Sequence, residues 1–311
     1  MNKAMVIGAS GGMGYSLVRE LSSRGFAVKA FARTKSKLEK LYSQDKNVEV
    51  VVGDVFDYAT LLHASKDVDV IFQAANLPYV EWESQLPSFI KQILRVAEEN
   101  QSKVAFVENI YAYGKNIGTK ITESDPKTPH TKKGKIRLEV EKLIKDSNVP
   151  SIIAHFPDFY GPNAENTILH LTLNNVVNNK RALFVGDKRI AREYIYTPDG
   201  AKALVSLSLC NEAYGQCWNI PGHDVITGEQ LIEIIRNQTQ YKKSVSTVTK
   251  NMIKLLGVFD KNMREVVEMY YLNEDPVILS GNKYKVNIGE IPSTSYEIGI
   301  KETLSFMSKN L

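Results

Sequence analysis

Short apolar runs alternate with amphipathic segments over the first half of the chain. The apolar runs predict buried strands, and the segments between them repeat apolar residues at helical spacing. Strands that are apolar throughout must be covered on both faces, so the alternation predicts an α/β fold with a doubly wound parallel sheet. The predicted strands lie at 5–7, 27–32, 48–52, 68–74, 104–107 and 151–156. One predicted helix begins at the end of the glycine turn, at Gly14, and another begins at Ala59. Three more span 35–42, 83–99 and 132–145.

Three glycines join the first predicted strand to the first predicted helix. Gly8 permits a sharp turn, Gly11 lets the backbone approach a pyrophosphate, and Gly14 lets the helix pack close to the strand. Free N–H groups at the helix start then face the phosphates, and the helix dipole favours the negative charge. A tight structural turn is the alternative, but the βα alternation that follows favours a dinucleotide-binding Rossmann fold. The residues expected to touch the cofactor are Gly8, Ser10, Gly11, Gly12, Met13 and Gly14.

After Gly161-Pro162 the regular alternation of predicted strands and helices ends, and the predicted helices become more frequent and less regular. A strand at 216–220 could extend the sheet. The other predicted elements are strands at 182–185 and 193–196 and helices at 167–178, from Gly200, and near 227–238, 249–257, 262–272 and 297–308. We therefore predict a smaller, mostly helical C-terminal substrate lobe that closes over the cofactor. The predicted cofactor-binding domain is 1–160, joined by 190–220, and the predicted substrate lobe is 161–189 with 221–311.

Composition narrows the class of protein. Apolar residues make up 43% and charged residues 24% of the 311 residues, as in ordinary globular proteins. The net charge of +4 is small for this length and argues against a nucleic-acid-binding protein. Two cysteines predict no disulfide framework, and the five scattered histidines give no metal-ligand spacing, so we expect no metal. No apolar run approaches the ~20 residues of a membrane helix, and no signal peptide is evident, so we expect a cytoplasmic protein without a membrane partner.

The residues after the second and third strands bear on the choice of cofactor. In this fold an acidic residue after strand two binds the ribose of NAD, whereas a cation suits the extra phosphate of NADP. Arg33 occupies that position, with Lys35 and Lys37 close behind, which favours NADP(H) over NAD(H). A solvated residue at a helix start is the alternative for Arg33. Asp54, which Val55 follows, is placed to accept from the adenine amino group, or else is a turn or N-cap residue.

Several segments together resemble the extended short-chain dehydrogenase/reductase family, in its nucleotide-sugar epimerase/dehydratase group. The resemblance covers nearly the whole chain. It rests on the glycine loop, Gly53-Asp54-Val55, Val70–Ala75, Tyr113-Gly114, Phe159–Pro162, Arg192–Asp199 and Trp218-Asn219-Ile220. The resemblance implies further cofactor contacts at Val55, Gln73, Ala74, Ala75, Phe156 and Asp158.

The three catalytic positions of that family are substituted in this chain. The family uses a Ser or Thr after strand five and a Tyr-x-x-x-Lys pair on the next helix, where the lysine lowers the tyrosine pKa and holds the nicotinamide ribose. Counting back from Tyr113-Gly114 places Asn109 at the serine position. Aligning the helix places Lys133 at the tyrosine and Arg137 at the lysine. Tyr111-x-x-x-Lys115 also fits the pattern, but it lies at a strand end where the two residues share no helical face.

Two interpretations of these substitutions stay open. In the first, Arg137 holds the cofactor ribose, Lys133 is the acid with a pKa lowered by a neighbouring cation, and Asn109 orients the substrate carbonyl. In the second, residues 132–137 are a solvated basic helix start. Gly134 costs about 1 kcal/mol relative to Ala inside a helix, which suggests that another part of the chain approaches it closely.

The substrate positions depart from the family as well. Asp158 replaces an Asn that donates to a nucleotide-sugar diphosphate, and a carboxylate there repels a diphosphate unless it is protonated or paired. Arg192 either contacts that diphosphate or is a structural ion-pair residue, and His155 is expected to be a packed histidine. By position, the residues that could line the substrate pocket are Gln73, Asn76, Tyr111, Tyr113 and Arg192.

Three functions remain. The leading hypothesis is an NADP(H)-dependent oxidoreductase with altered acid–base residues, acting on a small carbonyl or alcohol compound. The others are a nucleotide-sugar epimerase and a non-catalytic NADP(H) sensor. The family also builds a two-fold interface from the helices that fall here at 83–99 and 132–145, so we expect a homodimer.

Overall fold

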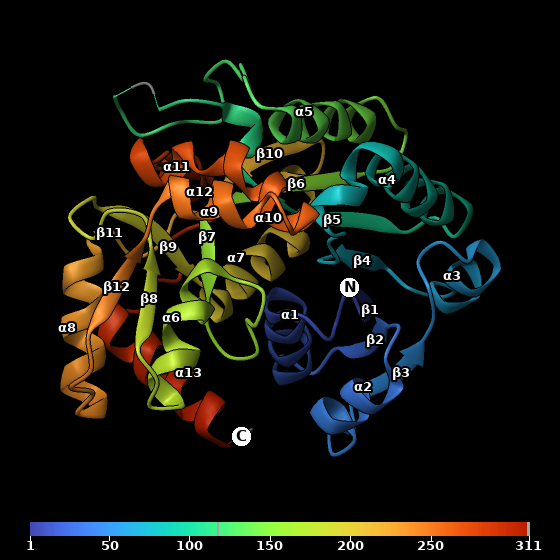
Figure 1. The fold of residues 1–311 in the computed structure, drawn as a ribbon. Coiled ribbons are helices and arrows are strands. Elements are labelled where there is room, and N and C mark those ends of the chain that lie inside the picture. Colours follow the sequence, from blue (N-terminus) through green and yellow to red (C-terminus); the bar gives the residue numbers. More distant parts are fainter. Residues whose placement is uncertain (117, 310–311) are drawn as a thin grey trace.

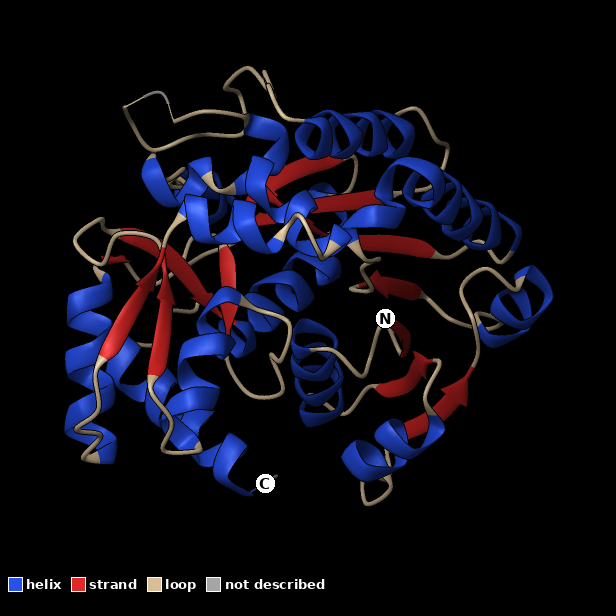
Figure 2. Ribbon diagram, viewed as in Figure 1, coloured by secondary structure: helices blue, strands red, loops and turns tan. Residues whose placement is uncertain are grey.

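A seven-stranded parallel sheet forms the centre of the fold, in the computed structural model that describes residues 1–116 and 118–309 (Figures 1 and 2). The strand order is β10-β6-β5-β4-β1-β2-β3, and every neighbouring pair is parallel. The order reverses beside β1, and the carboxyl end of the sheet at such a point is where ligands bind in this class of fold. The strands are β1 Lys3–Ile7, β2 Ala27–Ala32, β3 Val48–Val52, β4 Val70–Gln73, β5 Lys103–Asn109, β6 Ser151–Phe156 and β10 Gln216–Asn219.

Helices cover both faces of the sheet, because consecutive strand residues point to opposite sides. In β1, Ala4 and Val6 enter one apolar core while Met5 and Ile7 enter the other. The first core is covered by α1 Gly12–Ser23, α2 Lys35–Tyr42 and α7 Thr197–Leu209. The second is covered by α3 Tyr58–Ala64, α4 Trp82–Glu99 and α5 Lys132–Lys145. The predicted doubly wound fold is confirmed, and β10 extends its sheet as expected.

A smaller lobe with its own apolar core follows β6 and lies beside the sheet in Figure 1. It contains a three-stranded sheet in the order β11-β9-β7 and a two-stranded sheet of β8 and β12. Its strands are β7 Asp158–Tyr160, β8 Ala182–Val185, β9 Arg192–Tyr196, β11 Val225–Ile226 and β12 Val245–Val248. Its principal helices are α6 Ile168–Val177, α8 Gly228–Thr239, α9 Lys250–Leu256, α10 Lys261–Val266 and α13 Tyr296–Lys309, whereas α12 Asn282–Asn287 buries Tyr284 in the first core of the large sheet.

The shortest elements that follow β6 were not predicted from the sequence. The strands β7, β11 and β12 and the helix α12 were not predicted, because two to six residues are too few to show a period. The helix predicted at 262–272 is wrong as one element. It is broken into α10, the 3₁₀ turn η4 Val267–Met269 and α11 Tyr271–Glu274.

The helices α4 and α5 turn their apolar residues toward the sheet. Phe89, Ile90 and Ile93 of α4 and Ile136 and Val140 of α5 are buried in the core that these helices cover. None of the described residues of either helix is an exposed large apolar side chain. A two-fold pairing through these helices would therefore rest on polar contacts, and the homodimer stays a prediction.

A buried ionic network ties the loop before α5 to the sheet. Lys127 forms an ion pair with Glu141, and His155 Nε2 lies 3.2 Å from the same carboxylate oxygen of Glu141. Burial, together with the nearby charge of Lys127, lowers the pKa of His155 from 6.5 to about 4. His155 is therefore a packed histidine, as expected, and it stays neutral at pH 7.

This histidine should make the protein less stable in mild acid. Unfolding restores a pKa of 6.5, so the unfolded state binds more protons between pH 6.5 and about 4, and stability falls as the pH drops through that window. The full effect is on the order of 3 kcal/mol. We expect His155→Gln to flatten the pH dependence of the free energy of unfolding over this range, measured by urea denaturation. His63→Gln removes an exposed histidine and is the control; an unchanged slope in His155→Gln would contradict the prediction.

Candidate functional site

The glycine loop, residues 8–14, forms the floor of the site where β1 ends. Gly8 has a φ of +83°, and a Cβ on Gly8 would lie 2.6 Å from the backbone nitrogen of Ala75. A Cβ on Gly14 would lie 2.1 Å from the carbonyl oxygen of Gly8, so only glycine lets α1 pack this closely. Gly11 occupies the N-cap of α1, and no side chain caps that end of the helix. The first N–H groups of α1 are therefore available to a phosphate.

The loop after β4 forms the adjoining wall. Gln73 folds its side chain back onto this loop, where Nε2 donates to Ala75 O at 2.8 Å and Oε1 accepts from Ala75 N at 2.9 Å. Ala74 N donates to Ile7 O at 3.0 Å, which fixes the same loop to β1. The amide of Gln73 thus shapes this loop, and its predicted contacts with cofactor and substrate stay predictions.

The residues proposed for the adenosine end lie after β2 and β3. Arg33 is exposed and forms no ion pair within residues 1–116 and 118–309. Asp54 is exposed and accepts from Phe56 N at 3.0 Å, so it is a turn residue, while the N-cap of α3 is Asp57. The Val55 carbonyl accepts a hydrogen bond from the side chain of Gln92. Cofactor contacts at these positions stay predictions.

A segment of the smaller lobe, residues 163–165, crosses the glycine loop, and no sequence pattern predicted this contact. Asn163 Nδ2 donates to Ser10 O at 3.1 Å. A Cβ on Gly12 would lie 2.6 Å from Ala164 Cα, so the two backbones touch. Glu165 then forms an ion pair with Lys37 of α2 at 2.7 Å. Residues 163–165 thus connect the smaller lobe to both α1 and α2.

The family's tyrosine position holds a buried lysine clamped by two carboxylates. Lys133 is 1% exposed, and its Nζ lies 2.5 Å from Glu265 Oε2 and 2.6 Å from Glu268 Oε1. Glu268 also accepts from the backbone nitrogens of Lys132 and Lys133, at 3.0 and 3.2 Å. The interpretation of this stretch as a solvated helix start is therefore wrong for Lys133. We call Lys133, Glu265 and Glu268 the lysine clamp.

The charge of Arg137, which occupies the family's lysine position, is also balanced by a partner inside the protein. Arg137 Nη1 donates to Glu108 Oε1 at 2.9 Å, and its Nη2 donates to Asn76 Oδ1 at 2.9 Å. The guanidinium lies 4.0 Å from the centre of the Trp82 ring, a cation–π contact. Burial raises the pKa of Glu108, and the charge of Arg137 opposes that rise.

The serine position is occupied by a capping residue. Asn109 Oδ1 accepts from Tyr111 N at 3.0 Å and so caps the 3₁₀ turn η2 Ile110–Tyr113. The Tyr111 carbonyl is packed against α5, because a Cβ on Gly134 would lie 2.6 Å from that oxygen. The expectation that another part of the chain approaches Gly134 is confirmed.

Two tyrosine hydroxyls lie beside the lysine clamp. Tyr111 and Tyr79 join hydroxyl to hydroxyl at 2.7 Å, and Lys133 Nζ lies 5.2 Å from the centre of the Tyr79 ring. Tyr79 belongs to the 3₁₀ turn η1 Tyr79–Glu81 and makes an edge contact with Trp82 at 4.9 Å. Burial raises the pKa of both tyrosines, so both hydroxyls keep their protons at neutral pH. Tyr113 does not join them, because it is 2% exposed and donates to Asn219 Oδ1 at 2.7 Å.

The remaining predicted residues lie near β7 and β9. Burial raises the pKa of Asp158, and Arg192 opposes the shift. Arg192 donates to Val185 O at 2.8 Å and to Asn273, and it forms no ion pair among the residues that the structure describes. These contacts therefore do not support the alternative that Arg192 is a structural ion-pair residue. Phe156 is fully buried in the core, so only its backbone could meet a cofactor.

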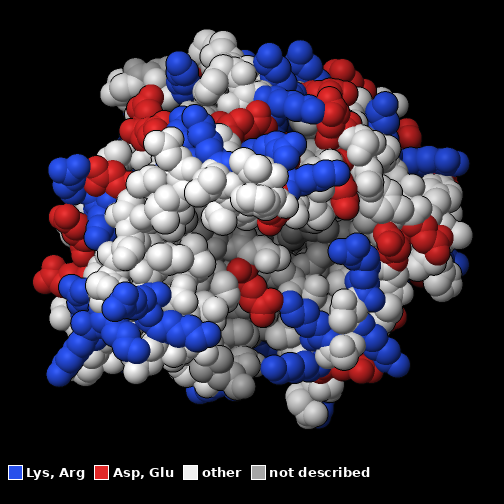
Figure 3. Space-filling model, in the orientation of Figure 1, with Lys and Arg blue, Asp and Glu red and all other residues white. Residues whose placement is uncertain are grey.

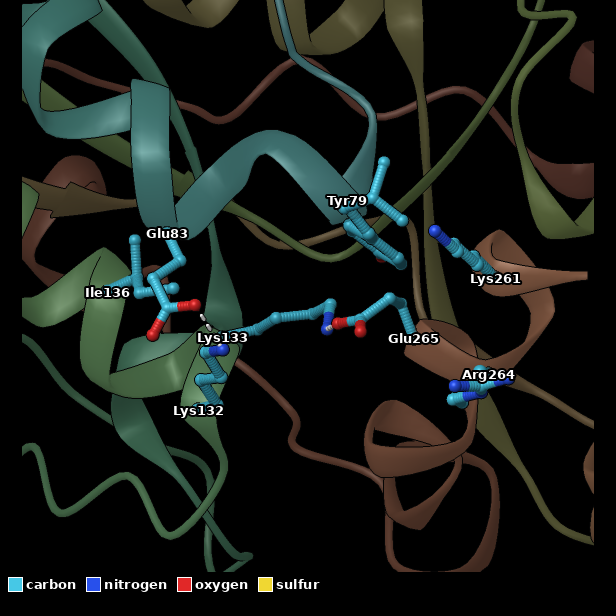
Figure 4. A pocket seen from close by; sticks show the side chains of 9 residues that line it. Tyr79, Glu83, Lys132, Lys133, Ile136, Lys261, Arg264 and Glu265 are labelled. Atoms are coloured by element: carbon cyan, nitrogen blue, oxygen red, sulfur yellow. Dashed lines mark hydrogen bonds and ion pairs between the residues drawn. The ribbon is translucent and has the colours of Figure 1, made fainter. Parts of the chain in front are cut away.

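A small polar pocket opens next to the lysine clamp (Figure 4). Its volume is about 310 Å³. Figure 4 shows Lys261 and Tyr79 pointing toward one another across it, and Glu265 reaching Lys133. The lining residues are Tyr79, Val80, Glu83, Lys132, Lys133, Ile136, Lys261, Arg264 and Glu265. They come from η1, α4, α5 and α10, so the pocket lies between the two lobes beside the family's tyrosine position.

A model of the NAD(P)H-binding family matches residues 8–174, which include the glycine loop and the positions 109, 133 and 137. The chain belongs to this NAD(P)H-binding family. A provisionally named UDP-glucose 4-epimerase of Methanocaldococcus jannaschii is 20% identical over 326 aligned positions, covering 98% of each chain.

Solved structures show the same fold over the whole chain. A dTDP-glucose 4,6-dehydratase of Bacillus anthracis in complex with NAD superposes with a TM-score of 0.81 at 18% identity, covering 100% of this chain and 97% of the other. A UDP-glucuronic acid 4-epimerase of Bacillus cereus, with UDP-glucuronic acid and NAD, gives 0.81 at 15% identity, covering 99% and 100%. This NAD(P)H-binding protein therefore has the extended short-chain dehydrogenase/reductase fold. Among its described residues no helix is long and apolar enough to cross a membrane.

The two halves of the lysine clamp should differ in their effect on stability. Lys133 is 1% exposed, whereas the side chains of Glu265 and Glu268 are 33% and 29% exposed. Glu265→Gln with Glu268→Gln leaves a buried ammonium without a counter-charge, which costs on the order of 3 kcal/mol. Lys133→Met leaves carboxylates that water can still reach, so we expect a cost of only about 1 kcal/mol.

Urea denaturation of the two variants measures this asymmetry. Lys132→Met is the control, because it breaks the exposed ion pair with Glu83 and should not change the free energy of unfolding measurably. A larger loss in Lys133→Met than in the double glutamine variant would show that the carboxylates, not the ammonium, are the buried charges.

Proposed function

We propose that this protein is an NADP(H)-dependent oxidoreductase of the epimerase/dehydratase type that acts on a small carbonyl or alcohol compound without the usual Tyr-x-x-x-Lys pair. The observation that carries the proposal is the glycine loop. Gly8 and Gly14 are fixed at distances that no other residue allows, and the uncapped start of α1 faces the carboxyl end of the sheet. Arg33 at the end of β2 supports the choice of NADP(H).

The bound cofactor would supply or accept the hydride, so the chain must supply or accept the proton. The hydroxyl pair of Tyr79 and Tyr111 is the source that we propose, because both groups are protonated and Tyr79, which bonds Tyr111, lines the pocket. Lys133 then lies near the Tyr79 ring rather than serving as the acid, because its Nζ is taken up by the ion pairs with Glu265 and Glu268. Arg137 and Asn109 would position the loops at residues 76 and 111.

Nucleotide sugars are the less favoured substrates. The dehydratase and epimerase structures with this fold carry them in their names. Here Asp158 replaces the family's diphosphate-binding Asn, and Arg192 is already bonded to Val185 and Asn273. A diphosphate would thus meet a buried carboxyl group and would have to compete for the arginine.

A non-catalytic NADP(H) sensor is the second candidate, and one observation favours it. The cations at the positions of the family's tyrosine and lysine are both neutralised by carboxylates of the same chain, those of Glu265, Glu268 and Glu108. A sensor would bind the cofactor without turnover, and its affinity for a partner would change with the cofactor's redox state.

The cofactor preference should depend on Arg33. We expect NADPH to bind more tightly than NADH in fluorescence titrations, and Arg33→Ala to weaken NADPH binding about tenfold, or about 1.4 kcal/mol, with little effect on NADH. Lys40→Ala removes an exposed cation from the last turn of α2 and is the control. Equal affinities for the two cofactors, or an unchanged preference in Arg33→Ala, would refute this assignment.

Turnover should depend on the tyrosine pair. Loss of a general acid typically costs about 10²- to 10⁴-fold in rate. We therefore expect Tyr79→Phe with Tyr111→Phe to lower kcat for NADPH oxidation with small aldehydes and ketones by about that factor. The affinity for NADPH, measured separately by fluorescence, should not change.

Tyr113→Phe is the control for this experiment, because it removes the hydroxyl that bonds Asn219. Full activity of the double phenylalanine variant would rule out the tyrosine pair. NADPH binding without turnover on any carbonyl compound tested would instead favour the sensor.

A further inference from the structure

The turn between α9 and α10 exposes a cluster of large apolar side chains. Five of them lie between residues 252 and 259: Met252 at 47% exposure, Leu255 at 66%, Leu256 at 53%, Val258 at 64% and Phe259 at 87%. We call residues 250–264 the apolar hairpin. Other exposed large apolar residues of the described chain, such as Val286 at 84%, lie singly in the sequence. Single exposed apolar residues are normal, whereas a cluster marks a surface that binds something.

The hairpin does not need these side chains to hold its own shape. Ile253 is buried and packs with Val248 and Tyr270 in a small core of its own. Gly257 N donates to Ile253 O at 2.8 Å, and Arg264 Nε donates to Gly257 O at 3.1 Å. The exposed apolar residues add nothing to this scaffold and cost solvation free energy, so a partner outside the chain is the physical reason for them.

Cations border the apolar side chains on both helices. Lys250 and Lys254 lie on α9, and Lys261 and Arg264 lie on α10. Lys250 pairs with Glu274 at 3.2 Å, whereas Lys254 and Lys261 form no ion pair among the described residues, and Lys261 also lines the pocket beside the lysine clamp. In Figure 3 the white surface over this part of the face is bordered by blue side chains.

The carboxylates near the hairpin already have hydrogen-bond or ion-pair partners within the chain. Asp260 caps α10, where its Oδ1 accepts from Asn262 N at 2.8 Å. Glu265 and Glu268 hold Lys133 in the lysine clamp. The hairpin therefore presents apolar side chains beside Lys254 and Lys261, which pair with no carboxylate among the described residues.

We propose that the apolar hairpin docks the protein peripherally on an anionic lipid surface. Apolar side chains beside lysines and arginines are the combination that binds the interface of such a membrane, with the apolar groups among the acyl chains and the cations at the headgroups. The protein lies on the membrane rather than in it, because no described helix could span one. A second copy of the chain fits less well, since a standard protein interface uses about 20–30 residues from each partner and this surface is a single short hairpin.

Flotation of the full chain with lipid vesicles tests the proposal. We expect binding to vesicles of equal parts phosphatidylcholine and phosphatidylglycerol, and at least tenfold weaker binding to phosphatidylcholine alone. Raising the salt concentration should weaken binding, because screening shortens the range of the charge interaction. Leu255→Ser with Phe259→Ser should abolish binding, and Lys254→Gln should weaken it.

Val286→Ser is the matched control, since it removes an equally exposed apolar residue from α12. Circular dichroism melting should show that all variants are folded. Equal vesicle binding by the Leu255→Ser, Phe259→Ser variant and by Val286→Ser would overturn the proposal. So would equal binding to neutral vesicles. Light scattering that finds a dimer dissolved by the same two serines would assign the hairpin to a second copy instead.

Discussion

The charge of a buried lysine at the start of α5 must be balanced, and this requirement determines how the two lobes meet. An ammonium group loses most of its hydration when it is buried, and it is stable there only if opposite charge is supplied at close range. Lys133 also lies in the first turn of a helix, where the macrodipole is positive and disfavours a cation. Glu268 offsets both costs, because its carboxylate pairs with the ammonium and accepts hydrogen bonds from the first N–H groups of the same helix.

The same requirement explains the unusual charge pattern of the site. Each cation at a family position has a carboxylate from a different part of the chain, Glu108 for Arg137 and the smaller lobe's glutamates for Lys133. In the family pattern a lone cation near the tyrosine promotes proton loss from its hydroxyl. Here the cations are balanced, and burial keeps the protons on Tyr79 and Tyr111.

Much of the fold could be read from the sequence because the information is local. The bounds of α2, α5 and β6 agree with their predicted ranges residue for residue, since apolar period and flanking turn residues lie within each segment. The glycine loop and the crowding at Gly134 were likewise predictable from single residues. The lysine clamp was not, because Glu265 and Glu268 lie in a stretch with no motif and reach Lys133 only through the packing of α10 and η4. The tyrosine pair was missed for the same reason, since hydroxyls far apart in the chain leave no spacing to count.

Residues 163–165 lie across the glycine loop and contact it directly. Asn163 is bonded to Ser10 O, and Glu165 is paired with Lys37. The side chains of Lys37 and Glu165 are 43% and 53% exposed, and such a surface ion pair contributes little to stability. The contact between residues 163–165 and α2 can therefore open at little cost in free energy, so the smaller lobe is held to α2 only weakly at this point.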